Sequence, residues 1–211
     1  MLLDLLLPRR CVVCARAGVQ LCAACSAALP RLTPPLCACC GAPVSWPVER
    51  CRECNGRRLG FATARAAVAY DGDVRRLVAR WKEGGLRRLD LASVVAERVP
   101  RPDADALTFV PAEPWRSRQR GHHPAESLAR GLAEAWRLPC EPRLRRLDAH
   151  KQSARTRTER RRGPRFAALA TGGRLVLVDD VYTTGATASA AAAALAGHVQ
   201  VVTLARALRT G

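Results

Sequence analysis

The sequence predicts an α/β protein with a mostly parallel sheet, preceded by a small cysteine-rich module. Two observations carry this prediction. From Phe61 onward, apolar strand-like segments alternate with helical ones, which is typical of a parallel sheet. Before that point, nine of the ten cysteines fall between Cys11 and Cys54. We therefore expect two domains, a module at residues 1–58 and an α/β domain at residues 61–211.

The expected elements of the second domain follow from apolar periodicity and from glycine or proline stops. Strands are expected at 62–70, 104–112, 174–180 and 199–207. Helices are expected at 72–85, 89–99, 125–136 and 186–197. Each strand but the last is followed by at least one helix, as a parallel sheet requires.

The charge of the chain favours an anionic partner. Lys and Arg number 35 against 18 Asp and Glu, a formal net charge of +17. Only Lys82 and Lys151 are lysines, so a GC-rich genome is an alternative source of the arginine excess. The apolar opening MLLDLLL is too short for a membrane helix. We expect a cytoplasmic protein without membrane insertion, in which thiols stay reduced.

Four C-x-x-C turns occur in succession in the cysteine-rich module. Such a turn directs two sulfurs at one centre, and two turns complete a tetrahedral zinc site. The order predicts two structural sites: Cys11, Cys14, Cys22 and Cys25, then Cys37, Cys40, Cys51 and Cys54. Gly41 suits the tight turn after Cys40. Disulfides or unpaired thiols are the alternative, and whether both sites are filled stays open.

The stretch GGRLVLVDDVYTTGATASAAAAAL (172–195) carries the most specific functional signal. Asp179 and Asp180 end a buried strand, where parallel sheets bind their ligands. The TTGAT that follows opens a helix, whose free N–H groups and dipole suit a phosphate. The two carboxylates can accept hydrogen bonds from a sugar diol or hold Mg²⁺. Together they describe a site for a ribose 5-phosphate.

VLVDDVYTTGAT closely resembles the phosphoribosyl-pyrophosphate (PRPP) motif of type I phosphoribosyltransferases. With the cysteine turns, the LLDLLLPRRCVVC opening, WKEGG and the VTLARA ending, the whole chain resembles the ComF family of competence-associated bacterial proteins. The resemblance implies a type I phosphoribosyltransferase-like sheet behind a double zinc ribbon. It assigns Asp179 and Asp180 to ribose hydroxyls or Mg²⁺. It assigns the 5-phosphate to Thr183, Thr184, Gly185, Ala186 and Thr187.

Two basic segments resemble further parts of that family. In 109–129, Arg116, Arg118 and Arg120 match the pyrophosphate-side loop, whereas His122, His123 and Pro124 replace its Phe-Asn-Gln, and we expect both histidines at the surface. Residues 137–165 resemble the family's flexible hood and hold eleven basic against three acidic residues, a net +8. We add Lys82 and Lys151 to the three arginines as residues for pyrophosphate or nucleic acid.

The expected function is that of a ComF-like protein that binds PRPP and Mg²⁺ and, through its basic surface, single-stranded DNA during DNA uptake. Other proteins of the competence machinery are further candidate partners. Turnover stays open: the enzymatic interpretation is pentosyl transfer to an unknown acceptor. One alternative is a PRPP-sensing or DNA-binding module without turnover. Another is a nucleobase salvage phosphoribosyltransferase, for which no base-binding signature is legible.

Overall fold

The body of the protein is built on a parallel sheet with the strand order β1-β6-β5-β2. We describe a computed structural model, in which residues 9–83, 90–113, 122–147 and 164–208 are described. The strands are β1 (Thr63–Ala69), β2 (Ala106–Phe109), β5 (Arg174–Tyr182) and β6 (His198–Arg206). All three pairings between neighbouring strands are parallel, so their carboxyl ends share one edge.

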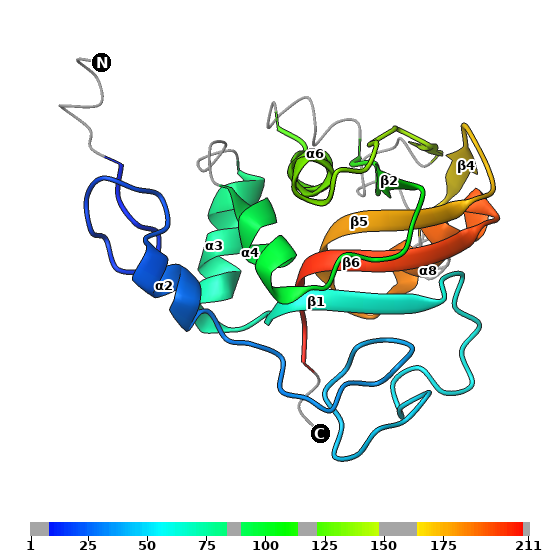
Figure 1. The fold of residues 1–211 in the computed structure, drawn as a ribbon, viewed down its shortest axis with the longest axis horizontal. Coiled ribbons are helices and arrows are strands. Elements are labelled where there is room, and N and C mark those ends of the chain that lie inside the picture. Colours follow the sequence, from blue (N-terminus) through cyan, green and yellow to red (C-terminus); the bar gives the residue numbers. More distant parts are fainter. Residues whose placement is uncertain (1–8, 84–89, 114–121, 148–163, 209–211) are drawn as a thin grey trace, which may run out of the picture.

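Helices cover both faces of this sheet, because its side chains are apolar on both sides. They are α3 (Gly72–Lys82), α4 (Leu91–Arg98), α6 (Pro124–Trp136) and α8 (Ala186–Leu195). Along β5, Val176 and Val178 pack into the core formed with α3, α4 and α6. Leu175 and Leu177 alternate with them and pack towards α8 on the opposite face (Figure 1).

The cysteine-rich module lies against the sheet and its helices at two places. Its short helix α2 (Ala23–Ala28) lies beside α3 (Figure 1). Arg98 of α4 donates to the carbonyl oxygens of Ser26 and Leu29. The loop that holds Cys37 to Cys54 runs alongside β1, and the Ala64 N–H donates to the Cys39 carbonyl at 2.8 Å. Its cysteines share a buried cluster with residues of β5, β6 and α8.

A small antiparallel sheet of β3 (Leu144–Arg146) and β4 (Phe166–Ala168) was not predicted from the sequence. β3 lies within the segment 137–165, which we expected to be a basic hood. Most of the remainder of that segment, residues 148–163, lies outside the described residues.

The predicted fold class, a parallel α/β sheet behind a cysteine-rich module, is confirmed. The eight expected elements are all present, with bounds that differ by a few residues. The largest functional difference concerns β5, which continues two residues past the paired aspartates, to Tyr182. Within the described ranges, no helix combines the length and apolar character needed to cross a membrane.

Candidate functional site

Two clusters of four cysteines form in the module, with the membership that the four C-x-x-C turns predict. They are Cys11, Cys14, Cys22, Cys25 and Cys37, Cys40, Cys51, Cys54. Within each cluster all sulfurs lie within 4.8 Å of one another. In the second, Cys40 and Cys51 are 3.5 Å apart and Cys37 and Cys54 3.7 Å. A tetrahedral zinc–thiolate site has sulfur–sulfur edges of about 3.8 Å. The clusters therefore fit zinc.

Backbone N–H groups favour the ionised form of Cys37 in the second cluster. Burial raises its pKa, but the N–H groups of Cys40, Cys51 and Cys39, together with the Cys54 thiol, lower the pKa to about 7. The Cys51 N–H lies 3.3 Å from the Cys37 sulfur. At Gly41, φ is +70°, and a Cβ there would collide with the Ala64 carbonyl oxygen. The tight turn expected of Gly41 is therefore also a point of close approach to β1.

We expect purified protein to contain two Zn²⁺ per chain, measured by atomic emission. Cys37→Ser should lose one zinc, because three thiolates no longer close the tetrahedron. Cys39→Ser is the matched control, since Cys39 is buried beside the cluster but is not among its four sulfurs. Equal zinc contents in the two variants would contradict the assigned ligand set.

A cavity of about 400 Å³ lies at the carboxyl end of the sheet, between β5, β2 and the start of α6. Asp179 and Asp180 both line it, together with Thr183 and Thr187 of the following loop. Burial, and then the charge of Asp180, raises the pKa of Asp179 well above its usual range. Lys82 of α3 balances part of this charge through an ion pair of 2.6 Å with Asp180. The paired carboxylates thus form a site that favours additional positive charge.

The loop after β5 brings backbone N–H groups to the same wall. Gly185 caps α8 with φ at +72°, and a Cβ there would collide with the Tyr182 hydroxyl. Only glycine suits both conditions. A small hollow of about 20 Å³ is lined by Asp179, Thr183, Gly185 and Thr187, among others. The Ala186 N–H lies 3.4 Å from the Thr184 hydroxyl, which is a weak contact, and Thr184 itself is exposed.

His122 and His123 are not the surface residues that we expected. Both line the cavity and are half-buried. His123 caps α6, where the Glu126 N–H lies 3.1 Å from Nδ1, and the Ala112 N–H lies 2.8 Å from Nε2. Burial lowers the pKa of His123, which keeps the ring uncharged. His122 contacts the Trp81 ring edge-on. The two histidines therefore position the segment between β2 and α6. Their rings combine a polar nitrogen for backbone N–H groups with an aromatic face or edge for packing.

Several predicted residues have no described position. Arg116, Arg118, Arg120 and Lys151 lie outside the described residues. Of the residues assigned to the pyrophosphate or nucleic-acid side, only Lys82 is described, and it contacts Asp180 at the cavity wall.

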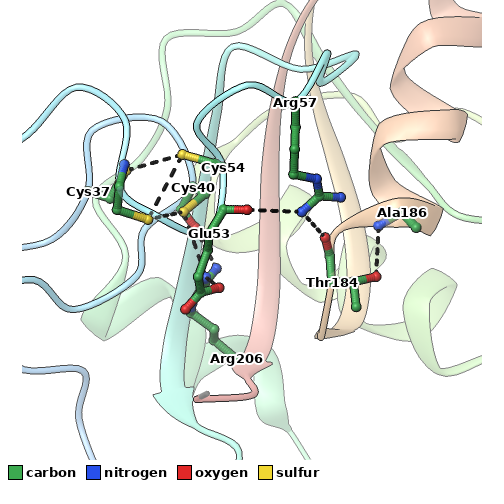
Figure 2. Close-up of polar contacts among 9 residues, drawn as sticks. Cys37, Cys40, Glu53, Cys54, Arg57, Thr184, Ala186 and Arg206 are labelled. Carbon is green, nitrogen blue, oxygen red and sulfur yellow. Dashed lines mark hydrogen bonds and ion pairs between the residues drawn. The ribbon is translucent and has the colours of Figure 1, made fainter. Parts of the chain in front are cut away.

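Sequence reasoning missed Arg146, Arg57 and Arg206. Arg146 of β3 lines the cavity and pairs with Glu113 at 3.3 Å. Arg57 donates to Thr184 in the loop after β5, and Arg206 contacts Cys40 of the second cysteine cluster (Figure 2). In an arginine-rich chain no pattern marks these three, because each differs from the others only by its tertiary contacts.

Comparisons with known proteins bear on both parts of the chain. Residues 2–55 match the family model of the double zinc ribbon domain. Over 192 residues the chain is 28% identical to the competence protein ComFC of Bacillus subtilis, which covers 83% of this chain and 78% of that protein. A solved structure of the allosteric regulatory enzyme of purine biosynthesis overlaps 60% of this chain at 23% identity, with a TM-score of 0.29. The overlap spans 26% of that structure's length.

A zinc-ribbon module with two four-cysteine sites, packed on a parallel α/β body with an acidic pair in its crevice, defines the class of protein. The zinc-ribbon match covers the module, and the likeness to the competence protein extends over most of the chain. Residues 2–55 thus match the double zinc ribbon domain, and the chain as a whole is similar to a bacterial competence protein.

Proposed function

We propose that this protein is a member of the ComF family and binds PRPP with Mg²⁺ in the crevice of a phosphoribosyltransferase-like domain at residues 61–211, behind a zinc module at residues 1–58. One observation carries the proposal. Asp179 and Asp180 line one cavity with Thr183 and Thr187 of the following loop, and Gly185 lines the small hollow that shares Asp179, Thr183 and Thr187. Carboxylates next to a loop that opens a helix suit a ligand that joins a diol to a phosphate. PRPP is such a ligand.

In this proposal each part of the wall has one task. The carboxylates of Asp179 and Asp180 accept hydrogen bonds from ribose hydroxyls, and the N–H groups of Thr183–Thr187 hold the 5-phosphate. Bound Mg²⁺ supplies positive charge for the pyrophosphate. Displacement at ribose C1, with pyrophosphate leaving, passes through a cation-like state that needs positioning and charge stabilisation more than a nucleophile from the protein. Carboxylates beside the ring favour that positive charge.

Isothermal titration with PRPP and Mg²⁺, followed by a pyrophosphate-release screen over nucleobases and nucleic acids, tests the proposal. Saturable binding that depends on Mg²⁺ supports it. Release with one base would favour the salvage interpretation. Binding of neither PRPP nor pyrophosphate in the presence of Mg²⁺ would overturn it.

A binding module without turnover is the second candidate, and the two histidines favour it. The His123 ring lies between the N–H groups of Ala112 and Glu126, one of which donates to it, and His122 lies against Trp81. The segment therefore has a positioning task at the place where the resemblance puts a ligand-reading Phe-Asn-Gln. PRPP binding without pyrophosphate release in any screen would support this candidate.

We further propose that the protein acts in the cytoplasm on single-stranded DNA during DNA uptake, together with other competence proteins. The net charge of +17 and the competence protein among its relatives support this proposal. Few aromatic side chains are available for stacking, since they make up 4% of the chain. Binding would therefore be mainly electrostatic and would depend little on base sequence.

For single-stranded DNA we expect affinity to fall steeply with salt, because bound arginines release counterions. Replacing Arg116, Arg118 and Arg120 together by alanine should reduce the slope of log K against log salt by about 2, at roughly 0.7 per phosphate contact. Fluorescence anisotropy with two unrelated oligonucleotides measures both slope and sequence dependence. A flat slope in the unchanged protein would assign the charge excess to genome composition.

A further inference from the structure

The segment that follows the second cysteine cluster contacts the phosphate loop directly. Arg57 donates to the Thr184 carbonyl oxygen at 2.7 Å, across 127 positions of sequence (Figure 2). The same guanidinium lies 3.4 Å from the carbonyl of Glu53, which stands between Cys51 and Cys54. Gly60, three residues further on, donates from its N–H to the Ser189 hydroxyl of α8 at 2.9 Å. The segment therefore holds both the loop and the helix that follows it.

The Arg57 contact fixes the direction of a ligand-binding N–H group. A trans peptide is planar, so its carbonyl and its N–H point in opposite directions. Because Arg57 holds the carbonyl of Thr184, the N–H of Gly185 points away from Arg57. Gly185 also lines the small hollow assigned to phosphate. The Tyr182 hydroxyl lies where a side chain at this glycine would be, so the peptide is restrained from two sides.

Arg206, at the end of β6, joins the same cluster to Tyr182. Its side chain is 2% exposed. It donates to the Cys40 carbonyl at 2.6 Å and to the Glu53 carboxylate at 2.7 Å, and it lies 3.7 Å from the Cys40 sulfur. Its guanidinium carbon is 4.5 Å from the centre of the Tyr182 ring. One buried cation thus contacts a metal ligand and the ring beneath Gly185.

We propose that the cluster Cys37, Cys40, Cys51 and Cys54 positions the phosphate loop, so that loss of its metal weakens anion binding at Thr183–Thr187. Arg57 and Arg206 are the positioning residues. The proposal deepens the PRPP assignment and rests on it for the identity of the anion. The first cluster is the internal comparison. It packs through Val12 and Leu21 against the core on the other face of the sheet. Among the described residues, no contact joins it to the loop.

Arg57→Ala tests the proposal with the metal in place. We expect both zincs to be retained, and Mg²⁺–PRPP affinity to fall about tenfold, the scale for one charge-assisted hydrogen bond. Arg58→Ala is the matched control. It removes the same charge from the neighbouring exposed position and should leave the affinity unchanged. Equal losses in the two variants would mean that charge, and not position, is responsible, and would overturn the proposal.

Hydrogen–deuterium exchange of the peptide covering 182–188 gives a readout that needs no ligand. Exchange should be faster in Arg57→Ala and in Cys51→Ser, and unchanged in Arg58→Ala and in Cys14→Ser of the first cluster. Unchanged exchange in Arg57→Ala would overturn the proposal, even if Cys51→Ser fails to fold. If the unchanged protein binds no PRPP while Arg57→Ala still accelerates exchange, the PRPP assignment fails and the positioning role stands.

Discussion

Arg206→Met should lower the free energy of unfolding by about 3–5 kcal/mol, the scale for breaking a buried ion pair by removing one partner. The buried Cys40 carbonyl and the partly exposed Glu53 carboxylate would both lose their cationic donor. Methionine retains the length of the side chain, so the loss reports charge and hydrogen bonds more than volume. Urea unfolding at a fixed free zinc concentration measures it.

Arg174→Met is the matched control for this prediction. Arg174 stands at the opposite end of the sheet and pairs with Asp103 and Asp105, but its side chain is 51% exposed. Exposed ion pairs contribute about 0–1 kcal/mol, so this variant should remain within about 1 kcal/mol of the unchanged protein. If both variants lowered the free energy of unfolding by similar amounts, Arg206 would contribute no more than an exposed ion pair does.

The fold was accessible from the sequence because its elements are long and strongly periodic. The apolar runs of β5 and β6, together with glycine and proline stops, mark where the strands and helices lie in the sequence. β3 and β4 were missed because three residues are too few to show a period of two. β5 extends two residues beyond the predicted end, because Val181 and Tyr182 stay in register with Ala205 and Arg206 of β6.

The acidic pair and the four cysteine turns could be found because each is local in sequence. The contacts that join them could not. Arg206 bonds Cys40 across 166 positions, and Arg57 reaches Thr184 across 127. In a chain with 35 basic residues, neither arginine is distinguished by its neighbours. Lys82 was noticed for its rarity, but its partner Asp180 became visible only when α3 was placed beside β5.

Asp179→Asn and Asp180→Asn should each weaken PRPP–Mg²⁺ binding by about 1–3 kcal/mol, the scale for charge-assisted hydrogen bonds. Both changes retain shape and remove charge, and both side chains face the cavity, so the fold should survive. Asp180→Asn also removes the partner of Lys82, whose freed charge would favour pyrophosphate and offset part of the loss. Asp179→Asn should therefore show the larger effect in isothermal titration.

The pH dependence of PRPP–Mg²⁺ affinity should also differ between Asp179→Asn and the unchanged protein. Burial and Asp180 raise the pKa of Asp179, so the empty site retains a proton at a pH where an ordinary aspartate has lost it. That raised pKa favours the folded protein at low pH, and the advantage is lost as pH rises through it. A ligand that needs both carboxylates ionised must expel the proton. PRPP–Mg²⁺ affinity should therefore rise with pH across this range, and Asp179→Asn should flatten the rise.

Thr184→Ala is the control on the phosphate side of the same wall. Its effect on PRPP affinity should be smaller than that of either aspartate change. In the proposed complex backbone N–H groups hold the phosphate, and the Thr184 hydroxyl makes only a weak contact with the Ala186 N–H. A ligand with a phosphate but no diol predicts the opposite order, since replacing either carboxylate by a neutral amide would remove repulsion. Tighter PRPP binding in Asp179→Asn would therefore refute the ribose assignment, whereas unfolding of both amide variants would return the pair to a structural role.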